Sequence, residues 1–89
     1  MHKIFSMTDF KVTIKIMPLK DLLDPQGKAV LSGLHNLELQ AINDVRIGKN
    51  IALQIQAANA QEAKEIATVA AKKLLANLVM EEFEVFVEA

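Results

Sequence analysis

Three segments of this chain alternate apolar and polar residues so regularly that a β-sheet is the structure they favour. The first spans residues 10–17 (FKVTIKIM), the second 51–56 (IALQIQ) and the third 81–88 (EEFEVFVE). Successive side chains of a strand point to opposite faces, so this period of two puts one row on the core and one row outside. The three segments are therefore predicted to be half-buried strands.

A fourth, shorter strand is predicted directly before the second segment. Residues 45–47 (VRI) place two apolar side chains on one face. Gly-Lys-Asn at 48–50 follows, and residues of these types tolerate the backbone of a tight turn. We therefore expect residues 45–56 to form a hairpin.

The first helix is predicted over residues 25–37. Asp24 can cap the free N–H groups of the first turn, and Pro25 has no N–H that would need a partner there. Apolar residues then recur at helical spacing, which gives the helix one apolar face. Gly33 lies beside that face, so we expect it to mark a close approach between helix and sheet.

The second helix is predicted within residues 59–77, where Asn59 and Glu62 have the spacing of a capping box. Its core stripe is expected at Ala63, Ile66, Ala67, Ala70 and Leu74. Further apolar residues continue around its shoulder, at Val69, Ala71, Leu75 and Leu78. Two explanations fit this shoulder: a wide core, or a surface that packs on another chain.

The elements follow in the order β-α-β-β-α-β, which predicts an α+β two-layer sandwich. Right-handed crossovers would place both helices on one face of a four-stranded antiparallel sheet, as in ferredoxin-like folds, with the strands in the order 4-1-3-2. The last strand would then pair antiparallel with the first. On the open face, lysines of the first strand would oppose glutamates of the last: Lys11 and Lys15 against Glu82, Glu84 and Glu88.

The composition indicates one small globular domain and argues against several partners. The 89 residues are 52% hydrophobic, enough for one core, which we assign to residues 9–89, with residues 1–8 as a leader or first-strand extension. Ten basic and eleven acidic residues nearly cancel, which argues against nucleic acid and acidic membranes as partners. No apolar run reaches the ~18 residues of a membrane span. Cysteine is absent, which excludes disulfides and thiolate metal sites, and we expect a cytoplasmic protein.

The sequence contains no recognisable constellation for catalysis, metal binding or nucleotide binding. DPQGKAV at 24–30 includes Gly-Lys, but a P-loop also needs an earlier glycine and a following hydroxyl, and VRIGKN at 45–50 fails the same test. His35 is predicted to be a partly exposed helix residue. The strand faces carry no aromatic platform for RNA bases. We therefore expect no catalytic, cofactor-binding or metal-binding residues in this chain.

Three segments carry a resemblance to a known family. They are LDPQGKAV (23–30), DVRIGK (44–49) and KKLLANLVMEEFEV (72–85). Together, in this order and spacing, they resemble PurS, the small subunit of phosphoribosylformylglycinamidine synthase. The resemblance extends from residue 9 to residue 88, and it implies a PurS-like domain with the ferredoxin-like architecture described above.

The resemblance implies a subunit of a glutamine-dependent, ATP-consuming C–N ligase of de novo purine biosynthesis. In that enzyme a glutaminase subunit releases ammonia, and a large synthetase subunit uses ATP and Mg²⁺. The small subunit, a homodimer or larger assembly such as a tetramer, bridges the two and helps to shield ammonia in transit. The candidates for partner interfaces are Asp24, Gln26, Lys28, Arg46, Lys49 and Asn77.

Two of these candidates lead to a specific expectation. Arg46 and Lys49 both leave the predicted hairpin, which packs few side chains, so we expect both to present positive charge to a partner subunit. Replacing both with alanine should then weaken complex formation and leave the melting of the isolated chain unchanged. For the motif that begins at Asp24, the sequence leaves open whether its role is structural or interfacial.

An alternative function is a stand-alone, ferredoxin-like dimeric module that binds a small regulatory molecule at its dimer interface. A ligand-dependent shift in the melting of the chain alone would favour this alternative. Glutamine-dependent activity with the two larger subunits would favour the enzyme subunit.

Overall fold

The computed structural model describes residues 7–88 as a three-stranded antiparallel sheet with two helices. The elements are β1 (Thr8–Pro18), α1 (Pro25–Asn36), β2 (Lys49–Ala57), α2 (Ala60–Ala70), its π-helical continuation η1 (Ala71–Leu75) and β3 (Glu81–Val87). The strand order is β2-β1-β3, so β1 lies in the centre and pairs antiparallel with both neighbours. The α+β class and the pairing of the first strand with the last are as predicted, whereas the predicted leader lies mostly outside the described residues.

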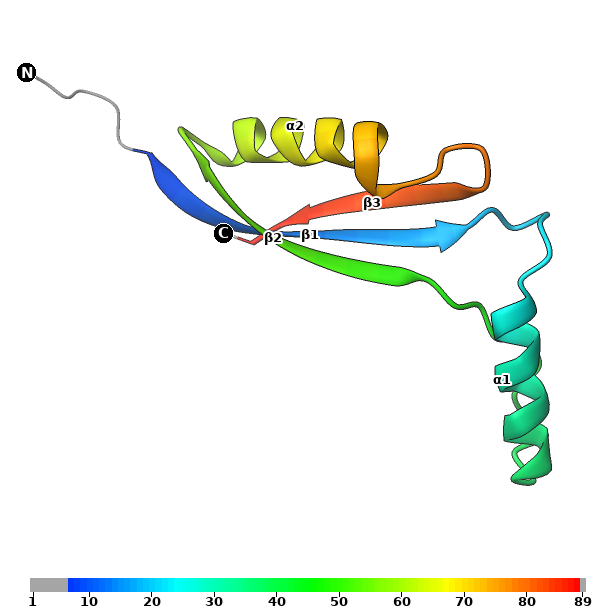
Figure 1. Cartoon of the computed structure of the whole chain (residues 1–89). Coiled ribbons are helices and arrows are strands. Elements are labelled where there is room, and N and C mark those ends of the chain that lie inside the picture. The colour runs from blue at the N-terminus through cyan, green and yellow to red at the C-terminus, as the bar shows by residue number, and fades with distance from the viewer. Residues whose placement is uncertain (1–6, 89) are drawn as a thin grey trace, which may run out of the picture.

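The molecule has the shape of a bracket, because the two helices lie in different places relative to the sheet. Helix α2 covers one face, while α1 projects from the end of the sheet, on the side away from α2 (Figure 1). The chain then returns along α1 to β2, and we call residues 25–48 the arm. The molecule extends 65 × 27 × 14 Å, with a radius of gyration of 17.9 Å. A compact chain of this length would have a radius of about 12 Å. Because α1 projects from the end of the sheet and only α2 covers a face, the prediction that both helices lie on one face is wrong.

The core lies between the sheet and α2. Its fully buried large side chains are all on the central strand: Val12, Ile14 and Ile16. The facing stripe of α2 and η1 consists of alanines, Ala63, Ala67 and Ala71, and such short side chains let the helix lie close to the sheet. Apolar residues of β2 and β3 pack around this centre, including Leu53 and Val85.

The predicted helix stripe is correct at Ala63 and Ala67 but wrong at Ile66 and Leu74, which are 43% and 82% exposed. At Leu74 the reason is the π-helical turn, in which the N–H of Ala76 bonds the carbonyl of Ala71, five residues earlier. In this wider turn, successive side chains are separated by a smaller angle about the helix axis than in an α-helix. Leu75 therefore packs against the core, where regular α-helix geometry would place Leu74.

The predicted fourth strand at 45–47 and its hairpin are also wrong. Residues 42–48 have no strand assignment, and β2 starts at Lys49, opposite Ile16, so two residues of the predicted turn are already in the sheet. Gly48 lies against the carbonyl of Ile16 and the sulfur of Met17, where an added Cβ would collide with both. The glycine therefore allows the close approach of the two chain segments and does not form a tight turn.

The helix starts follow the predicted capping. Asp24 caps α1 by accepting the N–H of Gly27 at 3.0 Å, with Pro25 as the first helical residue. At α2, Asn59 accepts the N–H of Glu62 at 2.8 Å, and the Glu62 carboxylate accepts the N–H of Ala58 at 2.8 Å. The reciprocal bond thus reaches one residue before the cap.

The arm is held together by polar contacts and ends in a helix-terminating turn. The ring of the half-buried His35 bonds the carbonyl of Ile42 at 2.8 Å, which ties the return segment to α1. At the tip, the N–H groups of Glu38 and Leu39 bond the carbonyls of His35 and Leu34, the pattern of a Schellman cap. Glu38 takes the left-handed conformation there, with φ 67°.

On the open face of the sheet, Lys15 lies opposite Glu84, and the N–H of Glu88 bonds the carbonyl of Lys11 at 2.9 Å. The predicted opposition of lysines and glutamates is thus present in the strand register. Among the described residues, none of these pairs approaches within 4.0 Å, so they are solvated charges. Within residues 7–88 no helix is both long and apolar enough to cross a bilayer.

Candidate partner interface at the base of the arm

The arm meets the sheet in a joint built around one carboxylate. Asp24 accepts the N–H of Gly27 through one oxygen and the N–H of Ile47, at 2.8 Å, through the other. These hydrogen bonds favour the charged form, so they lower the pKa of Asp24 below its usual 3.8, the bond from Ile47 having the largest effect. The start of α1 and the start of β2 are therefore clamped to the same side chain.

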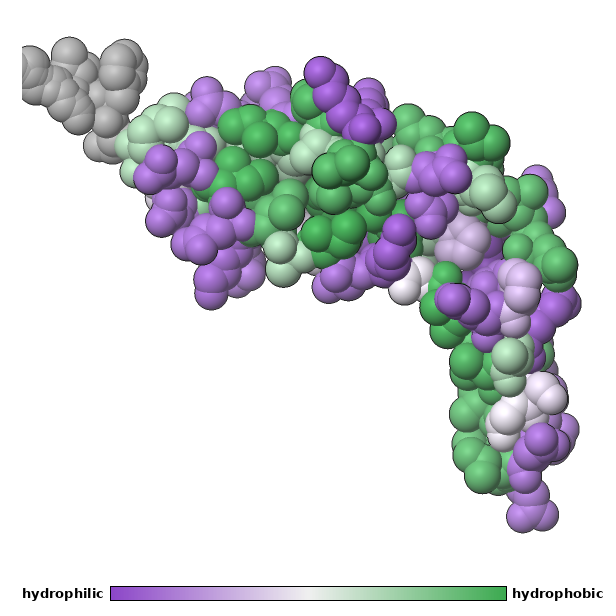
Figure 2. Space-filling model, in the orientation of Figure 1, coloured by the Kyte–Doolittle hydropathy of each residue, from purple (hydrophilic) through white to green (hydrophobic). Residues whose placement is uncertain are grey.

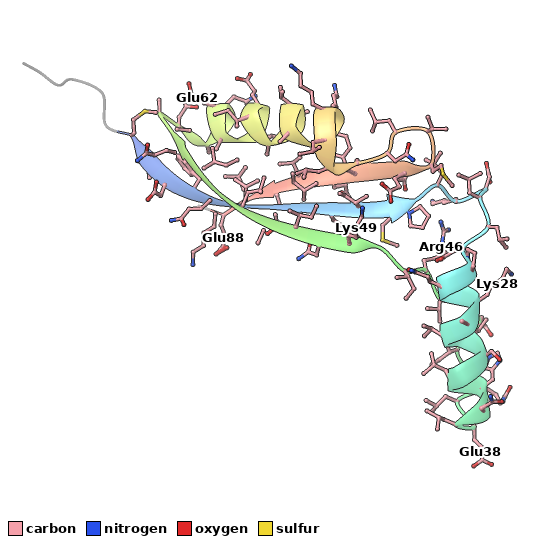
Figure 3. All side chains as sticks on the ribbon, in the orientation of Figure 1. Lys28, Glu38, Arg46, Lys49, Glu62 and Glu88 are labelled. Carbon is pink, nitrogen blue, oxygen red and sulfur yellow. The ribbon has the colours of Figure 1, made fainter. Side chains whose placement is uncertain are left out.

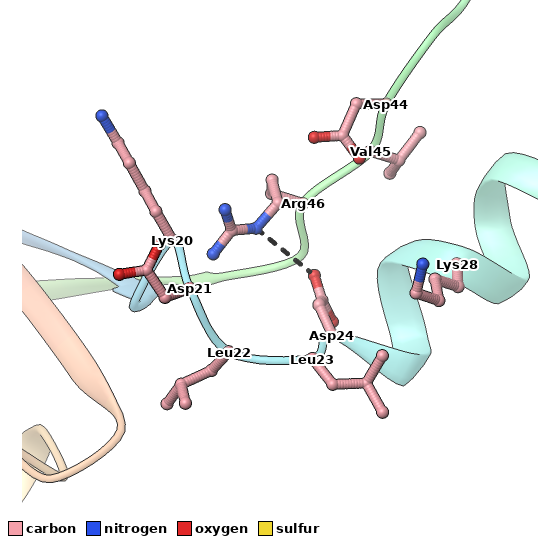
Figure 4. A pocket seen from close by; sticks show the side chains of 9 residues that line it. All are labelled: Lys20, Asp21, Leu22, Leu23, Asp24, Lys28, Asp44, Val45 and Arg46. Atoms are coloured by element: carbon pink, nitrogen blue, oxygen red, sulfur yellow. Dashed lines mark ion pairs between the residues drawn. The ribbon is translucent and has the colours of Figure 1, made fainter.

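Arg46 connects this joint to the end of β1. One terminal nitrogen of its guanidinium donates to the carbonyls of Pro18, at 2.6 Å, and Leu19, at 3.0 Å. Its Nε lies 4.0 Å from the Asp24 carboxylate (Figure 4). The hairpin from which the role of Arg46 was predicted is absent, and the side chain lies against the backbone at the end of β1. Its role toward a partner subunit stays a prediction.

Gly27 shows how tightly this joint is packed. An added Cβ would collide with the carbonyl oxygen of Val45 and with the Asp24 carboxylate. Gly33, which we expected at a close approach, has no such neighbour within 4 Å. The glycine that helix packing requires is therefore Gly27, and the prediction for Gly33 is wrong for this chain alone.

The remaining candidates lie on the surface around the joint. Gln26 and Lys28 are exposed on the first turns of α1, and Lys28 lies near the top of the arm in Figure 3. Lys49 is exposed at the start of β2 and forms an ion pair of 3.8 Å with Glu81. Asn77 shapes the turn before β3, because its side chain accepts the N–H of Val79 at 3.2 Å.

Two open hollows flank the joint. The first, about 400 Å³, is lined among others by Lys28, Asp44 and Arg46 (Figure 4). The second, about 570 Å³, is lined among others by Gln26 and Lys49. The charged side chains around the first hollow are three lysine or arginine cations and three aspartates, Lys20, Lys28, Arg46, Asp21, Asp24 and Asp44. Such mixed charge suits a polar protein surface better than a single small ion.

The hollows show that the three sequence motifs converge. Asp24–Lys28 and Arg46–Lys49 meet directly, and Glu81 reaches them through Lys49. Sequence reasoning missed Glu81, which also accepts the N–H of Asn77 at 2.8 Å. Its only signal was its place as the first residue of the alternating segment 81–88.

Apolar side chains extend this surface. The turn after η1 exposes three in succession, Leu78, Val79 and Met80, and Val79 is 81% exposed. On the arm, Val30, Leu37 and Leu39 are exposed as well. Figure 2 shows apolar residues along one side of the arm and over the body next to it. Exposed apolar area of this extent in a small chain is typical of surfaces that bind other proteins.

Comparison with known proteins identifies the family. The model of the family described as PurS, phosphoribosylformylglycinamidine (FGAM) synthase, matches residues 11–89. The PurS subunit of phosphoribosylformylglycinamidine synthase from Bacillus subtilis is 35% identical over 79 residues, 89% of this chain and 93% of that protein. Its counterpart from Thermotoga maritima is 34% identical over 76 residues, 85% of this chain and 93% of that protein.

Solved structures agree. The crystal structure of the Thermotoga maritima PurS subunit has a TM-score of 0.86 and 31% identity, covering 93% of this chain and 95% of that one. The PurLQS structure from Thermotoga maritima contains a chain with a TM-score of 0.85 and 33% identity, covering 92% of this chain and 100% of that one. The chain therefore belongs to the PurS family of phosphoribosylformylglycinamidine synthase subunits.

Proposed function

We propose that this chain is the small, non-catalytic subunit of phosphoribosylformylglycinamidine synthase, a ligase of purine biosynthesis. The observation that carries the proposal is the family match over residues 11–89. The similarity to a chain of the PurLQS structure supports a role within a larger complex. The same match favours the enzyme subunit over the stand-alone regulatory module.

We infer that the chain acts as an adaptor that bridges a glutaminase subunit and a large synthetase subunit. Ammonia released at one site must reach the other before water protonates it, because the ammonium ion is not a nucleophile. An adaptor helps by holding the two sites in a constant orientation. The clamped joint at Asp24 and Arg46 supports this role, since it makes the arm and the sheet one rigid unit.

The chemistry itself is assigned to the partners. ATP and Mg²⁺ would bind to the synthetase subunit, and the glutaminase subunit would release the ammonia. Within residues 7–88, no group of three or more histidine, cysteine, aspartate or glutamate side chains is arranged to hold a metal ion. The surface that the chain offers to its partners is the base of the arm, with Gln26, Lys28, Lys49 and Asn77 as contact residues.

We also propose that the chain forms a homo-oligomer. The arm adds 24 residues, 25–48, that extend beyond the sheet and keep apolar side chains such as Leu37, 70% exposed, in contact with water. Burying a leucine side chain stabilises an assembly by roughly 1.5–3 kcal/mol. An assembly in which neighbours cover part of this surface is therefore favoured.

Reconstitution tests the function. The chain is mixed with glutaminase and synthetase subunits, and amidine formation is measured with glutamine or with ammonium chloride as nitrogen donor. We expect the glutamine-dependent rate to require this chain and the ammonium-dependent rate to depend on it much less. Equal glutamine-dependent rates with and without the chain would contradict the proposal.

A further inference from the structure

The segment that connects α2 to β3 keeps large apolar side chains in contact with water. Leu74 and Val79 are the two most exposed large apolar residues of the described part of the chain, and Leu78 and Met80 are half exposed. We call residues 72–80 the exposed turn. It lies at the same end of the sheet as the arm, but on the side of α2 (Figure 1). The core between sheet and α2 does not use these side chains, so another role has to explain them.

Hydrogen bonds hold the exposed turn in one conformation. The carbonyl of Asn77 accepts the N–H groups of Met80, at 3.0 Å, and Glu81, at 2.7 Å, and its side chain accepts the N–H of Val79. The carbonyl of Met80 accepts the N–H of Leu19 at 2.9 Å, which ties the turn to the end of β1. Apolar side chains on a fixed turn lose little backbone freedom when a partner covers them. The turn is therefore preorganised for binding.

The π-helical continuation of α2 adds Leu74 to this surface. Because of the wider turn, Leu75 packs against the core and Leu74 points into the solvent. Single π-helical turns inside helices occur frequently at functional sites. Here the turn completes the core with one leucine and presents the next one outside.

Positive charge accompanies the apolar side chains. Residues 71–80 include Lys72 and Lys73, both exposed, and no acidic residue. Within residues 7–88 neither lysine forms an ion pair of 4.0 Å or less, and the neighbouring Glu81 is paired with Lys49. The exposed turn thus combines an apolar centre with a cationic border.

This charge indicates which kind of chain covers the turn. A second copy seated on it by a two-fold axis would bring two identical cationic borders together, and like charges in contact oppose association. A different chain, with an apolar pocket bordered by carboxylates, would bury the leucines and meet the lysines with opposite charge.

The exposed turn is also continuous with the base of the arm. Met80 and Glu81 line the second hollow there, together with Gln26 and Lys49. One partner chain would therefore cover both surfaces. Of the two proposed partners, the large synthetase subunit offers the greater surface for so extended a contact.

We propose that the exposed turn docks into an apolar pocket, bordered by carboxylates, on the synthetase subunit. Leu74 and Val79 supply the apolar contact, and Lys72 and Lys73 supply the charged border. The proposal deepens the adaptor function proposed above and rests on it.

Two matched pairs of variants test the apolar contact and the charge. Leu74→Ser with Val79→Ser is compared with Ile66→Ser and Val69→Ser, which change two exposed apolar residues of α2 outside the turn. Lys73→Glu is compared with Lys64→Glu, the same charge change on an exposed lysine of α2. Circular dichroism verifies that all four variants are folded.

Affinity for the purified synthetase subunit is measured by calorimetry with ATP and Mg²⁺, with and without the glutaminase subunit. We expect the serine pair in the turn to raise the Kd for the synthetase subunit about tenfold or more. Lys73→Glu should raise this Kd about fivefold, with a larger effect at low ionic strength. The two control variants should bind like the wild type.

Equal binding by the turn variants and their controls would overturn this inference, and so would a loss of affinity confined to the glutaminase subunit. Either result would leave the adaptor function standing if the wild-type chain supports glutamine-dependent activity. A wild-type chain that binds neither subunit and supports no such activity would overturn both.

Discussion

The two glycines of α1 provide a direct test of how the arm is packed. Gly27 and Gly33 lie six residues apart on the same helix, but an alanine methyl group would meet the Val45 carbonyl and the Asp24 carboxylate at Gly27 and open space at Gly33. Alanine is favoured over glycine in a helix by about 1 kcal/mol. The two substitutions to alanine should therefore change stability in opposite directions.

The magnitudes follow from the surroundings of each glycine. At Gly33 only the higher helix propensity of alanine acts, so Gly33→Ala should stabilise the chain by about 1 kcal/mol. At Gly27 the methyl group would strike the backbone carbonyl of Val45 and the carboxylate of Asp24, which two hydrogen bonds hold in place. Overpacking of this kind costs about 3 kcal/mol at the upper end, which leaves a net loss of about 2 kcal/mol after the helix term.

Thermal unfolding by far-UV circular dichroism is the suitable assay, because the chain has no tryptophan or tyrosine for fluorescence. For a domain of this size, 1 kcal/mol shifts the Tm by about 4–8 °C. We expect Gly33→Ala to raise the Tm by this amount and Gly27→Ala to lower it by about twice as much. A lower Tm for Gly33→Ala would show that the assembly packs tightly against that face of α1, and an unchanged Tm for Gly27→Ala would refute the close packing of the joint.

Four further substitutions test the joint and the tip of the arm. Arg46→Ala removes two charge-assisted hydrogen bonds and should lower the free energy of unfolding, measured in urea, by about 2 kcal/mol. Lys49→Ala removes only an exposed ion pair and should change the free energy of unfolding by less than about 0.5 kcal/mol. Equal effects of the two substitutions would contradict the structural role of Arg46. Because hydrogen bonds lower the folded-state pKa of Asp24, its contribution is complete above the usual value of 3.8 and is lost as the pH falls through the lower folded-state value. Asp24→Asn should therefore make stability less dependent on pH in this acid range, and an unchanged acid profile would refute the clamp. Glu38→Gly should stabilise the chain by about 1 kcal/mol, measured by thermal unfolding, because glycine adopts the left-handed conformation of residue 38 without strain; a destabilised variant would argue against that conformation.

Local sequence patterns predicted the features that local forces determine. The alternation around Ile14 identified the central strand and its buried face, and the spacing of Asn59 and Glu62 identified the start of α2. These predictions succeeded because side-chain period and capping depend on residues close together in the chain.

The wrong predictions concern segments whose conformation depends on residues elsewhere in the chain or on a local departure from regular geometry. Val45 and Ile47 alternate like a strand, but the carboxylate of Asp24, 23 residues earlier, takes the N–H of Ile47. Leu74 has the helical spacing of a core residue until the π-helical turn displaces it. At Glu38, the left-handed position of the helix cap is not occupied by glycine, the residue type from which such a cap is usually predicted.

The sequence predicted which residues belong to the candidate site, but it did not predict where in the fold they meet. The motifs gave six positions, and nothing in their spacing indicated that they would meet at the base of an arm. The inward orientation of Arg46 depends on the carbonyls of Pro18 and Leu19, at the end of a strand nearly thirty residues away. Every residue has a backbone carbonyl, so the sequence does not indicate which carbonyls will accept these hydrogen bonds.

The placement of the arm outside the core has an evolutionary consequence. One more turn of α1, with a matching extension of the return segment, would move the tip outward by about 5 Å without disturbing a single contact between sheet and α2. Insertions at the tip, near Glu38 (Figure 3), are therefore the least costly way to change how far the arm reaches. The reach of the arm can therefore change in evolution while the sheet and α2 stay unchanged.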